Sequence, residues 1–325
     1  MQKKRWMGVM SLALTGMLAL GGCKSDAAGK KDTVKIGISQ LADHPALDAT
    51  REGFEDGLKE LGVKAEIEYK NAQGEVPTSL SIAQKFVKDD ADLIYAIATP
   101  AAQSAKQATQ EIPILFSAVT DPVESEIVED WETPGGNVTG TSDQAPVKEQ
   151  LEMFKEIDPS IETIGILFNT DESNSQIQID EVKELAPSLG LKVETVGVSN
   201  VNDLPQAVDS LLNKVDALYS VSDNLVASSI GLISKKLIEK KMISISAEES
   251  QVAGGLLITK GLSYYELGRQ TAEMAKEILV DGKDPATLSV RKAENTVKTV
   301  NEKTLEALGL DISLPVFKDA EKPKE

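Results

Sequence analysis

Short runs of β-branched and other apolar residues alternate with longer amphipathic stretches along almost the whole chain. For example, the runs at 34–39, 65–69 and 93–98 are separated by amphipathic stretches at 45–61 and 77–88. This alternation is typical of βαβ units, in which parallel strands are joined by helices that cover the sheet. The sequence therefore predicts an α/β fold built from parallel sheets.

The order of elements restarts near residue 146, which predicts two similar Rossmann-like halves. Gly62 and Gly190 each lie in a matching segment, Leu-Gly-Val-Lys or Leu-Gly-Leu-Lys, as a glycine just past the end of a helix does. The remaining predicted strands and helices of the two halves are the strands 114–118, 137–140, 164–168, 192–198, 217–221 and 243–246, and the helices 101–109, 146–157, 175–189, 204–213 and 225–239.

The chain continues for about 70 residues after both halves are complete. This part predicts strands at 255–260 and 296–300 and helices at 264–279 and 302–308. Such a continuation most simply crosses back and forth, so we expect several hinge strands rather than one linker. The expected division is 33–142 with 247–283 as lobe 1, 143–246 with 284–317 as lobe 2, and a frayed tail at 318–325.

The first 23 residues have the pattern of a lipoprotein signal peptide. Lys3, Lys4 and Arg5 precede an apolar run that ends in Leu20-Gly21-Gly22-Cys23. We expect residues 1–22 to be removed, Cys23 to be lipidated at the outer face of the cytoplasmic membrane, and residues 23–32 to form a flexible tether. A transmembrane anchor fits less well, because the run is shorter than the roughly 20 apolar residues that a span needs.

Cysteine, histidine and net charge limit the chemistry of the chain. Cys23 is the only cysteine and His44 the only histidine, so the sequence predicts no disulfide, no metal site and no cofactor, and it favours no Ser-His-Asp arrangement. Removal of residues 1–22 takes away three cations and changes the formal charge from −18 to −21. We expect so acidic a surface to repel nucleic acid.

Polar residues directly follow the predicted strands. In open α/β sheets ligands bind beyond the carboxyl ends of the strands, so these residues are candidates for a binding site. They are Ser39-Gln40, Thr99 to Ala102, Ala118 to Pro122, Asn169-Thr170-Asp171, Ser222-Asp223-Asn224 and Ala247-Glu248-Glu249. We expect the two sets of strand ends to face each other across a cleft.

The types of these residues suit the two ends of a zwitterion. Thr99 opens a helix whose free N–H groups favour an anion, and Thr120 adds a hydroxyl from the neighbouring strand end. Asp143, Asp223 and Glu248 are candidate partners of an ammonium group, which needs such a partner when it is half-buried. Each of these residues also has an ordinary alternative role as a helix N-cap.

Two further residues stand out by their rarity. His44 is expected either to hydrogen-bond within its loop or to contact a ligand. Trp131, beside Pro134-Gly135-Gly136, is expected to pack at the surface rather than to stack on a ligand.

Five segments together resemble the substrate-binding lipoproteins of ABC transporters that have the type I periplasmic-binding-protein fold, in particular the family with tryptophan- and tyrosine-binding members. They are KIGISQLADHPALDATREGFEDGL, ATPAAQSA, FSAVTDPVES, GGNVTGTSD and GGLLITKGLSYYELGRQTAEMAKEIL, and the resemblance covers residues 33 to about 310. It implies two Rossmann-like lobes that are joined by about three hinge strands and close on one small molecule.

The resemblance also implies a function. We expect a monomeric, lipid-anchored receptor that binds a hydrophobic or aromatic L-amino acid and delivers it to a membrane permease driven by an ATPase. Thr99, Ala118 and Thr120 are assigned to the ligand carboxylate, Asp223 and then Glu248 to the ammonium, with Asp143 as a third choice. Gln40 and Asn169 are assigned as orienting amides, and Asn224 as a further contact.

Two other functions remain open from the sequence. A sugar, nucleoside or signalling molecule is the alternative ligand, although only 4% of the residues are aromatic and few rings could flank a sugar. The low aromatic content also leaves few rings to stack on an indole. A surface enzyme is the second alternative, and it lacks both a G-x-G-x-x-G segment after the first strand and a phosphate-binding G-x-x-x-x-G-K-[ST] motif.

Overall fold

The computed structural model describes residues 33–293 and 295–323. The predicted signal peptide, Cys23 and the whole predicted tether at 23–32 lie outside the described residues. Within the described part, no helix is long and apolar enough to cross a membrane.

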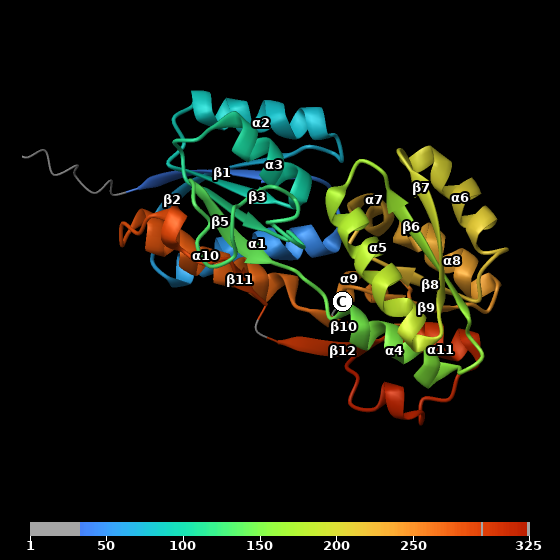
Figure 1. Cartoon of the computed structure of the whole chain (residues 1–325). Coiled ribbons are helices and arrows are strands. Elements are labelled where there is room, and N and C mark those ends of the chain that lie inside the picture. Colours follow the sequence, from blue (N-terminus) through green and yellow to red (C-terminus); the bar gives the residue numbers. More distant parts are fainter. Residues whose placement is uncertain (1–32, 294, 324–325) are drawn as a thin grey trace, which may run out of the picture. The chain divides into compact units, whose positions relative to one another are not determined.

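Two six-stranded sheets, each flanked by helices, organise the described residues (Figure 1). The first contains β1 (Val34–Gln40), β2 (Ala65–Asn71), β3 (Leu93–Ile97), β4 (Ile114–Ser117), β5 (Val138–Ser142) and β11 (Arg291–Lys292), in the order β11-β5-β4-β3-β1-β2. The second contains β6 (Thr163–Asn169), β7 (Lys192–Val198), β8 (Ala217–Ser220), β9 (Ile243–Ser246), β10 (Ile258–Leu262) and β12 (Thr296–Val300), in the order β12-β10-β9-β8-β6-β7. All pairs are parallel except β10 with β12, which confirms the predicted α/β fold.

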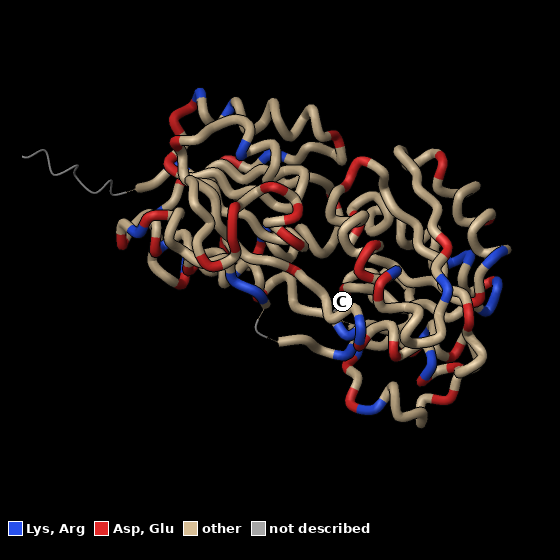
Figure 2. Tube along the Cα trace, in the orientation of Figure 1, with Lys and Arg blue, Asp and Glu red and all other residues tan. Residues whose placement is uncertain are grey.

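The helices divide between the two sheets. Those of lobe 1 are α1 (Pro45–Glu60), α2 (Val76–Lys88), α3 (Thr99–Ala108) and α10 (Tyr264–Leu279), whose buried side chains share one core with the first sheet. Those of lobe 2 are α4 (Val147–Ile157), α5 (Ser173–Leu185), α6 (Leu204–Leu211), α7 (Asn224–Ser228), α8 (Ile230–Glu239), α9 (Glu249–Ala253) and α11 (Glu302–Leu308). Asp and Glu residues are distributed along the chain of both lobes (Figure 2).

The chain crosses between the two sheets three times, after β5, between β10 and α10, and between β11 and β12. The expected boundaries differ from this division. Residues 247–262 belong to lobe 2, because Ile258 of β10 pairs with Ile245 of β9. Residues 284–292 stay with lobe 1, since Arg291 of β11 pairs with Thr141 of β5.

Close contact between α1 and α10 explains part of the glycine content of lobe 1. A Cβ on Gly53 would lie 2.0 Å from the carbonyl oxygen of Tyr265, and one on Gly268 would lie 2.0 Å from that of Thr50. Only glycine lets the two backbones approach this closely.

The ends of some predicted helices are confirmed, whereas other predicted helices and strands begin or end at different residues for local reasons. Gly62 and Gly190 have φ angles of 71° and 68°, as predicted for residues just past a helix. The helix predicted at 175–189 is α5 followed by a 3₁₀ segment at Ala186–Leu189, which contains Pro187. The strand predicted at 255–260 begins only at Ile258, because Gly255 has a φ of 113° that ends the preceding turn.

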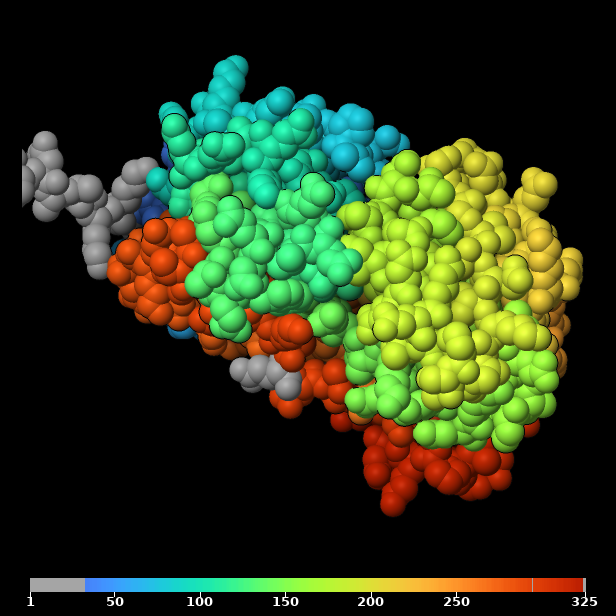
Figure 3. All heavy atoms as spheres, in the orientation of Figure 1, coloured from blue at the N-terminus to red at the C-terminus, as the bar shows by residue number. Residues whose placement is uncertain are grey.

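The C-terminal segment packs on lobe 2, which is visible as the red atoms of Figure 3. Val316 and Phe317 are buried in the second core. Glu321, predicted to be part of a frayed tail, instead exchanges backbone hydrogen bonds with Lys298 and Val300 at the edge of β12. The exposed edge of β12 supplies these partners, which composition alone did not predict.

Candidate functional site

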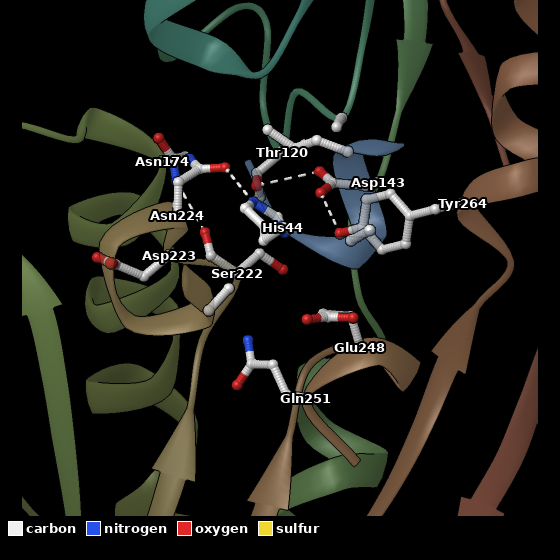
Figure 4. Close-up of a pocket in the computed structure, with 14 residues that line it drawn as sticks. His44, Thr120, Asp143, Asn174, Ser222, Asp223, Asn224, Glu248, Gln251 and Tyr264 are labelled. Carbon is white, nitrogen blue, oxygen red and sulfur yellow. Dashed lines mark hydrogen bonds between the residues drawn. The ribbon is translucent and has the colours of Figure 1, made fainter. Parts of the chain in front are cut away.

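A pocket lies where the carboxyl ends of the strands of both lobes meet (Figure 4). Its cavity volume is only about 20 Å³, room for about one water molecule, so a larger ligand requires the lining residues to move apart. Its lining comes from lobe 1, from the first crossover and from lobe 2: His44, Ala46, Leu47, Ala118, Thr120, Tyr264, Asp143, Asn174, Ser222, Asp223, Asn224, Ala227, Glu248 and Gln251.

The structure brings six of the predicted site residues to this pocket: Ala118, Thr120, Asp143, Asp223, Asn224 and Glu248. Three others are not in its lining. Gln40 donates to the carbonyl of Ala42 and to Asp48, while Asn169 donates to Glu172. Thr99 is the first residue of α3, and its Oγ1 is buried without a hydrogen-bond partner in the described part of the chain.

Asp143 lines the pocket from the first crossover, directly after β5. It is 4% exposed, and its carboxylate accepts hydrogen bonds from two hydroxyls, Thr120 Oγ1 at 3.2 Å and Tyr264 Oη at 2.6 Å. Burial raises the pKa of Asp143, and these hydrogen bonds only partly oppose that effect. Both hydroxyls can rotate, so the carboxylate is not locked into one set of partners.

Glu248 approaches the pocket from the start of α9 (Figure 4). Its carboxylate accepts from the backbone N–H of Ser250 at 2.6 Å and from the Ser250 hydroxyl at 2.8 Å. Burial raises its pKa to about 7, and the charge of Asp143 adds to this shift. Without a cation in the pocket, Glu248 is therefore held near its protonation midpoint at neutral pH.

Asp223 has a different set of partners, although it is equally buried. Its two oxygens accept from Asn169 N at 2.6 Å, Ser175 Oγ at 2.7 Å and Val226 N at 2.9 Å. The last bond caps α7, as expected from its position after a strand. In Figure 4 the carboxylate points away from Glu248 and Tyr264. Its assignment to the ligand ammonium stays a prediction, and the protein donors that already occupy the carboxylate do not favour it.

Glu172 lies behind this part of the pocket and was not predicted as a site residue. Its oxygens accept from N–H groups of Asn169, Asn174, Asn224 and Leu225. Burial, followed by the nearby charge of Asp223, raises the pKa of Glu172 to about 7. Glu172, the N-cap residue of α5, thus orients several amides of lobe 2.

His44 connects the two lobes. It lies at the start of α1 and its Nε2 is 3.1 Å from Oδ1 of Asn224 on α7. Burial lowers the pKa of His44, and the hydrogen bond with Asn224 only partly opposes this effect. This hydrogen bond joins His44 to the other lobe rather than to its own loop. His44 also lines the pocket, and its contact with a ligand stays a prediction.

Sequence analysis missed Tyr264, Ser222, Gln251 and Asn174 as pocket residues. Ser222 belongs to the strand-end segment Ser222-Asp223-Asn224, of which only Asp223 and Asn224 were predicted to bind the ligand. Tyr264 reaches the pocket because the second crossover places the start of α10 beside Asp143, and this required the three-dimensional path of the chain.

The electrostatics of the lining favour a cationic group. The pocket has three carboxylates, Asp143, Asp223 and Glu248, and no Lys or Arg among its lining residues. Within the described residues, no group of three or more His, Cys, Asp or Glu side chains could hold a metal ion. Hydroxyls and amides supply the other polar contacts.

Comparison with known proteins identifies relatives over nearly the whole chain. Residues 35–324 match the family described as ABC transporter substrate binding protein. A tyrosine-binding protein of Clostridioides difficile (strain R20291) is 41% identical over 319 residues, which cover 93% of this chain and 92% of that protein.

Two solved structures are similar in both sequence and fold. An ABC domain in complex with L-Trp from Streptococcus pneumonia is 34% identical, with a TM-score of 0.84 over 88% of this chain and 99% of that one. The ligand-free, open structure of a substrate binding protein with adhesive properties from Clostridium difficile is 44% identical, with a TM-score of 0.68 over 90% of this chain and 100% of that one. The similarity in fold is thus higher to the ligand-bound structure, although the identity is lower.

Proposed function

The chain belongs to the family of ABC transporter substrate-binding proteins, and we propose that its pocket binds an aromatic L-amino acid such as tyrosine or tryptophan for import. The names of the tyrosine-binding relative and of the L-Trp complex support this ligand class. The protein would act as a monomeric receptor that passes its ligand to a permease driven by a cytoplasmic ATPase.

The observation that carries the proposal is the pair of acids, Asp143 and Glu248, in a pocket lining without Lys or Arg. Burial raises the pKa of both groups, so each carboxylate is costly in the empty pocket. An ammonium group placed between them would offset this cost, because an opposite charge favours the ionised form. We therefore assign the ligand ammonium to Asp143 first and to Glu248 second.

The ligand carboxylate is assigned to the loop after β4 and the start of α3. Ala118 and Thr120 line the pocket, and backbone N–H groups in such loops can hold a carboxylate without a neutralising cation. The Thr120 hydroxyl already donates to Asp143, so the backbone is the better donor there. Thr99 Oγ1, which has no partner among the described residues, is a further donor if the pocket widens around a ligand.

The remaining lining suits an apolar ring. Ala46 and Leu47 from α1 and Ala227 from α7 form a corner beside His44 and Asn224. No Lys, Arg or large aliphatic residue other than Leu47 lines this corner. Once the lining residues move apart to make room, an aromatic side chain would extend into this corner while the charged end stays between Asp143, Glu248 and the loop after β4.

Calorimetry on residues 24–325 with the twenty amino acids tests the proposal. The protein should first be unfolded and refolded to remove any ligand carried through purification. We expect L-tyrosine or L-tryptophan to bind with a micromolar or lower dissociation constant. If no amino acid binds while ribose or a nucleoside does, the alternative ligand class replaces this one.

Lipid anchoring through Cys23 is a separate proposal. It is supported by the segment Leu20-Gly21-Gly22-Cys23 after a basic and then apolar stretch. The full-length protein should fractionate with membranes, and Cys23→Ser should move it to the soluble fraction or leave the signal peptide uncleaved. Equal membrane association of both proteins would contradict the anchor.

A further inference from the structure

His44 occupies an unusual position in the pocket corner formed by α1 and α7. It is the residue before α1, with extended backbone angles of −159° and 157°, yet its side chain makes no capping hydrogen bond. The imidazole is 7% exposed and lines the pocket together with Ala46, Leu47, Asn224 and Ala227. The side chain of His44 therefore neither caps α1 nor lies at the protein surface.

The partner of His44 determines which ring nitrogen carries the proton. The Nδ2 group of Asn224 donates to Glu172 Oε2, and its backbone N–H donates to the same oxygen at 3.1 Å. Because Glu172 accepts only N–H donors here, Asn224 must present its Oδ1 to His44. The contact of 3.1 Å then requires that His44 Nε2 carries a hydrogen and donates.

The other ring nitrogen is consequently an acceptor without a donor. Burial lowers the pKa of His44 more than Asn224, Asp48 and Asp43 raise it, so the ring is neutral at pH 7. In the neutral ring with a hydrogen on Nε2, Nδ1 has only a lone pair. Nδ1 is buried and has no hydrogen-bond partner in the described part of the chain. Such unpaired buried groups are rare in folded proteins and require an explanation.

We propose that His44 Nδ1 accepts a hydrogen bond from an O–H or N–H group on the ring of the bound ligand. This inference rests on the proposed function and names the residue that would select tyrosine or tryptophan over phenylalanine. Ala46, Leu47 and Ala227, which line the same corner, have no side-chain polar atom and cannot distinguish these three side chains by hydrogen bonding. A site built to bond a ligand donor rejects the analogue that lacks it, because the acceptor is then left unpaired.

Two protein variants separate recognition by His44 from a role in holding the lobes together. His44→Phe keeps a ring but removes both nitrogens. Gln103→Ala is the matched control, since Gln103 on α3 donates to Ser173 on α5 of the other lobe at 3.4 Å and does not line the pocket. Loss of a contact between the lobes alone should weaken all ligands by the same factor.

Calorimetry with L-tyrosine and L-phenylalanine is the test. We expect the wild-type protein to bind tyrosine at least 10-fold more tightly than phenylalanine, His44→Phe to reduce this ratio to about 1, and Gln103→Ala to leave it unchanged. Equal wild-type affinities for the two ligands, or a ratio that survives in His44→Phe, would overturn the assignment. Absence of binding by every amino acid would instead overturn the proposed function.

A measurement on the wild-type protein covers the case in which His44→Phe does not fold. His44 is the only histidine in the 325 residues, so ¹⁵N-histidine labelling of a protein without a histidine tag gives one pair of ring signals. Nδ1 should show the shift of an unprotonated nitrogen in the empty protein and move upon addition of tyrosine but not of phenylalanine. An identical response to both ligands, or a hydrogen on Nδ1 in the empty protein, refutes the assignment.

Discussion

Asp143→Asn is expected to lower ligand affinity with little change in folding stability, and Asp223→Asn to lower folding stability with little change in ligand affinity. Both carboxylates line the pocket and both are buried, with 4% and 1% exposure. They differ in what they bind within the protein. Asp143 accepts from two rotatable hydroxyls, whereas Asp223 accepts from two fixed backbone N–H groups and one hydroxyl.

In Asp143→Asn the ligand ammonium loses its charged partner. Truncating one member of a buried charge pair costs about 2 to 5 kcal/mol, so tyrosine should bind at least about 30-fold more weakly. The empty protein loses a charge-assisted hydrogen bond from Tyr264 but also no longer buries a carboxylate, and burial dominates the pKa of this group. We therefore expect its free energy of unfolding to change by less than about 1 kcal/mol.

In Asp223→Asn an amide nitrogen would face the backbone N–H of Asn169, which now donates to Oδ2 at 2.6 Å. An unpaired buried donor costs about 1 to 3 kcal/mol, and relief of the repulsion with Glu172 offsets part of it. We expect a loss of about 1 to 2 kcal/mol in the free energy of unfolding. Ligand affinity should change by less than about 5-fold, because protein donors already take three of the roughly four acceptor positions of this carboxylate.

Calorimetry with L-tyrosine and urea unfolding without ligand measure the two effects. Glu52→Gln, an exposed change on α1 outside the pocket lining, controls for the loss of one charge. The reasoning is refuted if Asp143→Asn binds tyrosine like the wild type while Asp223→Asn loses affinity. That result would return the ammonium to Asp223, the first choice from the sequence.

Two other predictions concern pH and packing. Because the pKa of Glu248 is raised to about 7, its contribution to stability is full below its ordinary pKa and is lost as the pH rises through 7. Affinity for an ammonium ligand should change in the opposite sense, because the ligand needs the ionised form of Glu248, and it should weaken by up to about 10-fold per pH unit below 7. Calorimetry from pH 5 to 8 checks this, and Glu248→Gln should flatten the dependence of affinity on pH. Gly268→Ala should destabilise lobe 1 by about 1 to 3 kcal/mol, because its Cβ would meet the carbonyl of Thr50. Gly231→Ala, with open space around it on α8, should not lower the urea midpoint.

The sequence predicted those features that depend on local pattern. The strands, the helix-ending conformations of Gly62 and Gly190, and the gathering of polar residues at strand ends all follow from residue types at fixed spacing. That the chain crosses between the lobes more than once also followed from its continuation after residue 246, whereas the number of about three was implied by the family resemblance. Such features do not require knowledge of which segments meet in space.

The division between lobes was less predictable, because it depends on which strands pair. The apolar residues 256–258 could extend either sheet, and only the pairing of Ile258 with Ile245 assigns them to lobe 2. Tyr264 follows from that assignment, since the chain must then return to lobe 1 directly after β10. The contact of Tyr264 with Asp143 joins residues 121 positions apart, a separation at which no periodic pattern carries information.

The sequence also did not show which role each buried acid has, because that role depends on which groups donate hydrogen bonds to its carboxylate. Asp223 and Glu172 accept mainly from N–H groups whose directions are fixed by the backbone and by buried amides, so protein donors occupy most of their acceptor positions before a ligand arrives. The side-chain donors to Asp143 are the hydroxyls of Thr120 and Tyr264, which can rotate to share it with an ammonium group. An N–H group cannot turn away without moving the chain, whereas a hydroxyl can exchange partners by rotation about one bond. In this pocket the type of donor around each acid therefore separates a structural carboxylate from one that is available to a ligand.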